Sequence, residues 1–455
     1  MSASQPFLPL TSTFGDPDTA AIWSEATTIE AWCRVEVALA DAQAELGDIP
    51  AADAEAIREW ADPRRVDADG LRDGMRNVGY PILPLLVQLR SGAPPTVTAS
   101  LHWGATTQDI MDTALALVLT RSLDRLDELV ARLGDALCVL AKEHRATVMA
   151  ARTHDQLAVP TTLGAKLAVF LVELGRGRDR LVRARSAVAM VSLFGAGGTA
   201  AALGPRSAAV RRGTAQRLGL ADADVPAHVA RDGLAEAAFV CAALAATAGR
   251  LAREVIALSR SEVDEVREVG GHHRGASSTM PQKVNPIASE TTVGFSILAA
   301  AQVPVLLAAM QPRHERAAGE WQAEWDALPL VATAAAGALR SAGDIVEGLR
   351  VDAARMARNL QLEGGMIMSE AAMMALAPMV GRGPAHDVVY AACERARVED
   401  LTFLVAMQAT LDPDLAERLP PMEELLRPDA YLGEAIAIAD RGVAAWVARR
   451  SADVA

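Results

Sequence analysis

One segment, residues 270–290, brings together side chains that could do chemistry. It reads GGHHRGASSTMPQKVNPIASE and carries two adjacent serines, Ser277 and Ser278, followed by Lys283 and Asn285. Its glycines and prolines interrupt any helix, although both flanking segments have strongly helical patterns. A glycine-rich segment with hydroxyl, ammonium and amide groups between two long helices is a good place for a mobile catalytic loop. The alternative interpretation is an ordinary solvated linker.

A second polar cluster, SLHWGATTQD, occupies residues 100–109 at the entry to a helical pattern. Thr106 and Thr107 could simply cap the N-terminus of that helix. Alternatively, their hydroxyls and the free backbone N–H groups of the helix start could receive a carboxylate. The residues alone leave both interpretations open.

A third polar cluster, ARTHDQLAVPTT, occupies residues 151–162. Its polar residues before Pro160 are Arg152, Thr153, His154 and Gln156. A lone histidine near a helix start is more often structural than catalytic, but this concentration of polar groups favours a functional role. All three clusters stand at the ends of long apolar helices, where distant segments can converge within a bundle or between subunits.

Long stretches of helical periodicity separate the clusters. In residues 109–143 the apolar residues alternate steps of four and three, which is a heptad seam. Similar long helices are expected at residues 161–191, 230–269, 286–310 and 315–348, and an amphipathic helix at residues 27–47. Five long helices joined by short connectors predict an elongated bundle. We therefore expect an all-α chain with three domains: an N-terminal helical domain at residues 1–110, the bundle at 111–350, and a small helical domain at 351–455.

The composition agrees with packed helices, because 51% of the residues are apolar and only 4% are aromatic. The net charge of −13 argues against a nucleic-acid partner held by a general positive field. The cysteines lie far apart in apolar helical patterns, as expected for buried thiols rather than disulfides or a zinc site: Cys33, Cys138, Cys241 and Cys393.

Two uncharged runs, residues 186–205 and 291–312, are long enough to cross a membrane. Without basic flanking loops or an aromatic belt, helices buried in a bundle are the favoured interpretation. The N-terminus lacks a basic region followed by an apolar core, so no signal peptide is expected and the predicted location is cytoplasmic.

The word SSTMPQKVNP resembles the signature loop of the fumarase/aspartase superfamily, GSSxMPxKxNP, with Ala276 in place of the usual glycine. The three polar clusters match the three conserved regions of that superfamily in order and spacing, across essentially the whole chain. The segments HWGATTQDIMDT, PAHVARD, HERAAGEWQAEWDALP and PDAYLGEA look most like the bacterial 3-carboxy-cis,cis-muconate cycloisomerase branch.

This resemblance implies an all-α fold in three domains with a central five-helix bundle. It also implies a homotetramer whose active sites each draw on three subunits. The chemistry of the superfamily is anti β-elimination from a succinyl-type group, or its reverse, on a small di- or tricarboxylate. No metal or organic cofactor is required. The neighbouring His272 and His273 lack nearby acidic or cysteine ligands, so a metal site is not expected.

The resemblance also implies roles for individual residues. Ser277 would be the base, activated by loop closure and backbone N–H groups, with Ser278 as its neighbour. His154 would be a general acid or a leaving-group contact. Lys283 and Asn285 would hold the carboxylate that gains charge. The residues implied in substrate binding are His102, Thr106, Thr107, Gln108, Thr153, Gln156, Arg231, Lys283 and Asn285.

Three features of the sequence distinguish between the branches of the superfamily. In adenylosuccinate lyases a serine and an arginine grip the nucleotide phosphate, whereas Trp321 and Trp325 stand at the comparable positions here. Some bacterial cycloisomerases have tryptophan where this chain has His154. The loop reads QKVNP rather than HKRNP, so Val284 replaces a cation that could meet a third carboxylate.

These departures favour a lyase that expels an amine or nitro group from a substituted succinate and releases fumarate. The cycloisomerase activity is the alternative. A non-catalytic helical homologue, like the lens crystallins related to argininosuccinate lyase, is disfavoured because Ser277, His154 and Lys283 are all present.

Overall fold

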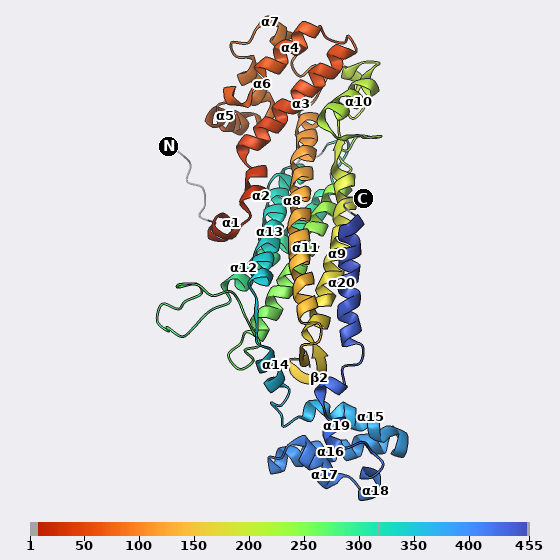
Figure 1. Cartoon of the computed structure of the whole chain (residues 1–455). Coiled ribbons are helices and arrows are strands. Elements are labelled where there is room, and N and C mark those ends of the chain that lie inside the picture. Colours follow the sequence, from red (N-terminus) through yellow and green to blue (C-terminus); the bar gives the residue numbers. More distant parts are fainter. Residues whose placement is uncertain (1–7, 317–318, 453–455) are drawn as a thin grey trace. The chain divides into compact units, whose positions relative to one another are not determined.

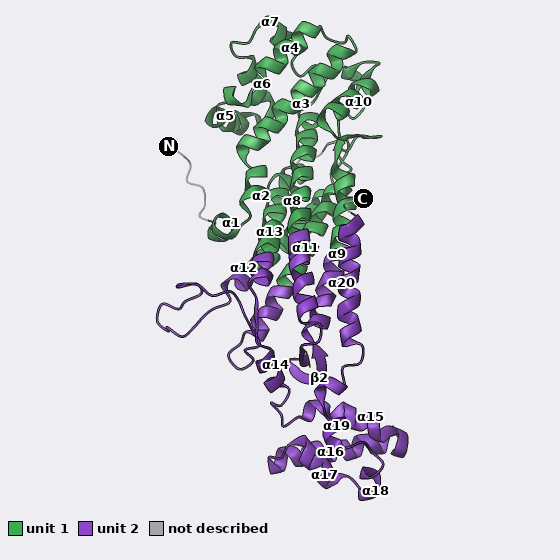
Figure 2. Cartoon of the chain, viewed as in Figure 1, with its two compact units in different colours: residues 1–130, 177–249, 291–340 green, residues 131–176, 250–290, 341–455 purple. Residues whose placement is uncertain are grey.

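The computed structural model describes residues 8–316 and 319–452. The chain divides into two compact units, shown in different colours in Figure 2. Unit 1 comprises residues 1–130, 177–249 and 291–340, and unit 2 comprises residues 131–176, 250–290 and 341–455. The structure is predominantly α-helical, which confirms the predicted fold class. The predicted three-domain division at residues 110 and 350 stays a prediction.

The expected long helices are present (Figure 1), and each has residues in both units (Figure 2). They are α8 (Thr107–Glu143), α9 (Leu163–Val188), α11 (Asp232–Leu258), α12 (Ile287–Ala309) and α13 (Glu320–Glu347). Their apolar seams are buried, as the heptad pattern requires: Leu119, Leu123, Leu126, Val130, Leu133 and Leu137 of α8 are all at most 2% exposed.

The predicted end of one long helix was wrong. Helical periodicity extends to residue 269, but α11 ends at Leu258. Backbone carbonyls that a longer helix would use are taken by other side chains: Arg355 Nε donates to Val263 O at 2.9 Å, and Arg355 Nη2 donates to Glu262 O at 2.8 Å. These tertiary hydrogen bonds override the local helical preference.

Unit 1 also contains a set of shorter elements around α3, which begins behind an N-cap at Ser24. These are α1 (Pro9–Phe14), α2 (Pro17–Ile22), α3 (Glu25–Glu45), α4 (Ala51–Trp60), η1 (Pro63–Arg65), α5 (Ala68–Val78), α6 (Ile82–Arg90), α7 (Pro95–Ser100), η2 (Ala201–Leu203) and α10 (Ser207–Leu218). A continuous apolar core that includes Leu39, Ile57 and Leu85 joins these elements, except α1 and η1, to the first turns of α8.

Unit 2 contains a second cluster of short helices with its own core, which includes Phe403, Met407 and Leu376. Its elements are α14 (Ala353–Asn359), η3 (Met366–Met368), α15 (Ser369–Val380), α16 (Arg382–Glu399), α17 (Phe403–Thr410), α18 (Pro413–Ala416), α19 (Met422–Leu425), η4 (Pro428–Ala430) and α20 (Ala435–Ala452). The last helix packs against α8, because Trp446 is 1% exposed and its indole donates to Asp135 at 2.8 Å.

Three pairs of short strands interrupt the helices in the described residues. They are β1 (Val148–Thr153) with β2 (Gln156–Thr162), β3 (Met190–Val191) with β4 (Ala221–Asp222), and β5 (Val266–Arg267) with β6 (Arg350–Val351). The first pair is an antiparallel hairpin and contains the third polar cluster. The sequence predicted a helix from residue 161, but Thr161 and Thr162 end this hairpin instead.

Two helices are long and apolar enough to cross a membrane by length and composition, although core helices of soluble proteins can be equally long and apolar. In the most apolar part of α11, 67% of the residues are buried, whereas in α12 only 33% are buried. Many apolar residues of α12 are therefore exposed in the structure of the single chain.

Candidate active site

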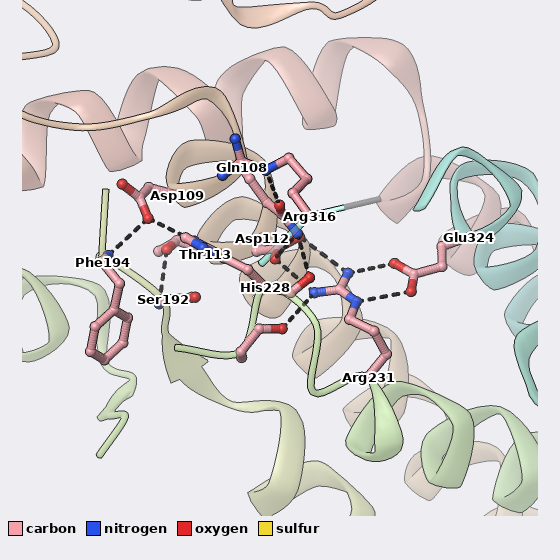
Figure 3. A network of polar contacts seen from close by, with 11 residues as sticks. Gln108, Asp109, Asp112, Thr113, Ser192, Phe194, His228, Arg231, Arg316 and Glu324 are labelled. Atoms are coloured by element: carbon pink, nitrogen blue, oxygen red, sulfur yellow. Dashed lines mark hydrogen bonds and ion pairs between the residues drawn. The ribbon is translucent and has the colours of Figure 1, made fainter. Parts of the chain in front are cut away.

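A buried carboxylate, Asp109, anchors the start of α8 (Figure 3). It accepts hydrogen bonds from the backbone N–H groups of Thr106 (3.0 Å), Phe194 (2.9 Å) and Gly195 (2.9 Å). Its Oδ1 also lies 2.9 Å from His228 Nε2. The carboxylate thus fixes the backbone of the second polar cluster. The backbone N–H of Thr106, which was a candidate donor to a ligand, already donates its hydrogen bond to Asp109.

The hydroxyls of Thr106 and Thr107 are half-buried beside this anchor. Neither hydroxyl has a hydrogen-bond partner among the residues that the structure describes, so both could donate to a ligand. Gln108 differs, because its side chain is 1% exposed. Its amide donates to Asp112 at 3.1 Å and to His228 O at 2.9 Å, and it accepts from Arg316 at 2.7 Å.

Arg231 is buried and its guanidinium is fully occupied (Figure 3). Nε donates to Glu324 at 2.9 Å, Nη1 donates to Asp112 at 2.7 Å and to Ala227 O at 3.1 Å, and Nη2 donates to both carboxylates. Burial raises the pKa of Glu324 above its ordinary value, and the ion pair with Arg231 opposes that rise. Since every N–H of Arg231 has an acceptor, this arrangement suits a positioning role better than direct substrate contact.

His102 forms a buried ion pair with Glu36. Its Nδ1 lies 2.6 Å from Glu36 Oε1, and the two side chains are 14% and 0% exposed. Burial by itself would lower the pKa of His102, but the charge and hydrogen bond of Glu36 outweigh it and raise this pKa above its ordinary value. The raised pKa favours an imidazolium at the predicted pocket, where a cation would attract a carboxylate.

The third cluster forms a hairpin with a two-residue turn at its tip, and it does not lie at a helix start. Thr153 pairs with Gln156, and both residues between them have positive φ, 52° at His154 and 61° at Asp155. This is a type I′ turn, which usually contains asparagine or glycine, so a histidine there costs on the order of 1–2 kcal/mol. Thr153, His154 and Gln156 are all exposed at this tip.

The signature loop has internal order around Ser277. The Ser277 hydroxyl oxygen accepts hydrogen bonds from the backbone N–H groups of Thr279 and Met280, each at 3.2 Å. Asn285 donates to Gly275 O from its backbone at 2.9 Å and from its side chain at 3.0 Å. Two N–H groups directed at Ser277 Oγ would stabilise negative charge on that oxygen, as a serine base requires.

The other predicted loop residues, Ser278 and Lys283, are exposed. The Asn285 amide, predicted to bind a carboxylate, instead closes the loop through its bond to Gly275. A single bridge between Ala276 and Val284 completes that closure. Ser278 and Lys283 are therefore presented to solvent from a closed loop.

The structure thus places the predicted residues in four groups, of which one is His102 paired with Glu36 in unit 1. Thr106, Thr107, Gln108 and Arg231 surround one buried network in unit 1. The hairpin and the signature loop belong to unit 2. The sequence analysis missed the residues that hold these groups: Asp109, Asp112, His228, Arg316, Glu324, Glu36 and Glu265. In Asp109 and Asp112, a signal was present as acidic residues on the otherwise apolar face of α8.

No group of three or more histidine, cysteine or acidic residues that could hold a metal ion exists in the part of the chain that the structure describes. The site groups contain serine, threonine, histidine, lysine and paired carboxylates. These are groups for acid–base chemistry on an anionic substrate.

Residues 14–303 match the family described as lyase, and residues 365–442 match the adenylosuccinate lyase C-terminus. A 3-carboxy-cis,cis-muconate cycloisomerase from Bradyrhizobium diazoefficiens is 38% identical over 92% of this chain and 94% of its own length. A nitrosuccinate lyase from Streptomyces davaonensis is also 38% identical, over 94% of this chain and 92% of its own. The crystal structure of a 3-carboxy-cis,cis-muconate lactonizing enzyme from Pseudomonas putida superimposes with a TM-score of 0.90 and 34% identity, covering 97% of this chain and 99% of that one.

These matches, with the all-α fold and the signature loop, define the class: the chain belongs to the fumarase/aspartase superfamily of lyases. Within that superfamily it is an enzyme of the cycloisomerase-like branch.

Proposed function

We propose that this enzyme is a cofactor-independent lyase that eliminates an amine or nitro group from a substituted succinate and releases fumarate. The observation that carries the proposal is that the Ser277 hydroxyl oxygen accepts hydrogen bonds from two backbone N–H groups. An alkoxide stabilised in this way can remove the weakly acidic proton from the carbon next to a carboxylate. The resulting dianion then expels the leaving group on the opposite face of the new double bond.

The remaining groups have complementary roles in this proposal. The exposed ammonium of Lys283 holds the carboxylate that gains charge in the transition state. The free hydroxyls of Thr106 and Thr107, with the imidazolium of His102, bind the second carboxylate. His154 protonates or contacts the leaving group from the tip of its hairpin.

The proposed enzyme is a homotetramer whose active sites are shared between subunits. The support comes from α12, which exposes large apolar side chains: Ile297 (57%), Leu298 (44%), Val305 (38%) and Leu307 (52%). A second copy of the same helix would cover them with a surface of matching character. This covering removes apolar area from water and explains the helix without a membrane.

A cycloisomerase that acts on 3-carboxy-cis,cis-muconate is the second candidate. The favouring observation is the aromatic cluster of Tyr80, Trp321 and Trp325, with ring centroids 5.3–6.3 Å apart. Trp321 and Trp325 also line a cavity of about 240 Å³ in unit 1. The same cluster disfavours adenylosuccinate lyase activity, because indoles stand where a phosphate clamp would be needed.

The deciding experiment mixes the enzyme with aspartate, nitrosuccinate, argininosuccinate, adenylosuccinate and 3-carboxymuconate, and follows ultraviolet absorbance. Fumarate that appears from one succinyl compound supports the lyase and identifies the leaving group. Loss of the muconate chromophore, with every succinyl compound inert, supports the cycloisomerase and rejects fumarate release.

A further inference from the structure

A buried ion pair connects the two catalytic segments of unit 2. Arg152, on β1, donates from Nη1 to Glu265 Oε2 at 3.0 Å and from Nη2 to Glu265 Oε1 at 2.6 Å. The Glu265 side chain is fully buried, and Asn359 Nδ2 donates to the same Oε1 at 2.8 Å. A bidentate pair with a third donor has a defined geometry as well as a strong attraction.

Arg152, at one end of this ion pair, lies on the hairpin that carries His154. Arg152 lies two residues before His154, next to an irregularity of register between Ala150 and Arg152. The turn itself has two non-glycine residues with positive φ, which the chain adopts only when surrounding contacts hold it. The guanidinium of Arg152 supplies such a contact at the strand that leads into the turn.

Glu265, at the other end of the ion pair, lies next to the base of the signature loop. The backbone of Glu265 accepts from Asp352 N at 3.0 Å, and the next two residues form β5, paired with β6. Glu268 then closes the loop from its other side, because its carboxylate accepts from Ser289 N (2.8 Å), Ser289 Oγ (2.6 Å) and Ala288 N (3.1 Å) at the start of α12. Both ends of residues 269–286 are thus fixed by contacts outside the loop.

We propose that Glu265 is a positioning residue that couples the placement of His154 to the base of the loop bearing Ser277. It touches neither substrate nor reacting atoms, and it acts through Arg152 on one side and through β5 on the other. This inference rests on the proposed function, since that proposal gives His154 and Ser277 their catalytic roles.

The first test is kinetic. Glu265→Gln keeps the size of the side chain but removes the charge that orients Arg152, and kcat is expected to fall about 100-fold, because small misplacements of catalytic groups cost that much. KM is expected to change less than kcat, because Thr106, Thr107 and His102, which bind the second carboxylate in the proposed function, lie outside both affected segments. The matched control is Glu262→Gln, whose carboxylate lies three residues earlier in the chain and pairs with Arg260 at the exposed surface.

A second variant guards against a folding defect. Arg152→Lys leaves a cation opposite Glu265 but loses the two-pronged geometry, so it should fold and still lose most of its kcat. The double variant Arg152→Gln, Glu265→Gln should be no slower than Arg152→Gln alone or Glu265→Gln alone, because the two residues act as one unit. Additive losses in that double variant would overturn the coupling.

Amide hydrogen exchange provides a readout that does not depend on activity. In Glu265→Gln, exchange should become faster in residues 148–162 and 266–286 together, while α15–α17 stay as in the wild type. Uniformly faster exchange, or a pattern like that of Glu262→Gln, would overturn the proposal. If the wild-type enzyme transforms no compound of the panel, the proposed function fails, but the exchange experiment still decides whether Glu265 couples the two segments.

Discussion

At the scale of single residues, the Ser277 hydroxyl is the group on which the proposed chemistry depends. Ser277→Ala removes the base while leaving the loop backbone intact, so kcat should fall about 10²–10⁴-fold. Stability should change by no more than about 0.5 kcal/mol, because the residue is not part of either core. Kinetics and thermal unfolding check both expectations, and Ser186→Ala, an exposed serine of α9, is the control. Full activity of Ser277→Ala would reject the assignment of the base.

The His102–Glu36 pair makes a pH-dependent prediction at the same scale. Because the pKa of His102 is raised in the folded protein, the pair contributes stability that is fully present below the ordinary histidine pKa of about 6.5. That contribution is lost as the pH rises through the raised pKa. The difference in Tm between the wild type and Glu36→Gln should therefore be largest in mild acid and shrink in alkali. Parallel Tm curves for the two proteins would contradict the raised pKa.

At the scale of elements, the signature loop depends on one glycine. Gly275 has φ +69°, and a Cβ there would lie 2.4 Å from Asn285 O, the residue that closes the loop. Gly275→Ala should therefore open the closure and reduce kcat at least tenfold, with little change in Tm because the loop lies outside the cores. Gly271→Ala is the matched control, since its Cβ would meet nothing nearer than 3.5 Å. Equal kinetics of the two variants would show that the closure is dispensable.

The elements also show what could be predicted from the sequence and what could not. The long helices were predictable because their apolar seams repeat every few residues, a local signal that α8 carries over its full length. The end of α11 was not, because Arg355 and Asn359, distant in sequence, take the carbonyl of Val263. The hairpin was missed because its turn reads His154–Asp155 instead of the usual asparagine–glycine signal.

The candidate site was predictable only where a motif carried it. Ser277, Lys283 and Asn285 belong to one contiguous sequence motif, and resemblance to a known family identifies such a motif directly. The residues that hold the site groups in place form no such motif, since Asp112 meets Arg231 and Arg152 meets Glu265 across more than a hundred residues. In the sequence these charges look like polar positions on solvated helix faces, and only the tertiary structure shows that they are buried and paired.

At the scale of the whole molecule, the proposal of shared active sites depends on the exposed apolar side chains of α12. If a second copy covers them, Ile297→Arg together with Leu307→Arg should disrupt the assembly, because each change forfeits about 1.5–3 kcal/mol of apolar burial and adds a charge to the interface. Arginine is a good helix former, so α12 itself should remain intact. Light scattering after size-exclusion chromatography should then show a species smaller than the wild type, with turnover lost in proportion.

The matched control is Val398→Arg on α16 of unit 2, an apolar residue that is 82% exposed and lies outside the core of that unit. This variant should keep both the mass and the activity of the wild type. An α12 double variant that is monomeric yet fully active would show that one chain builds a complete site. If the interface is required, mixing the α12 double variant with the inactive Ser277→Ala protein should restore no activity. Subunits that cannot assemble cannot contribute their hairpins and loops to a shared active site.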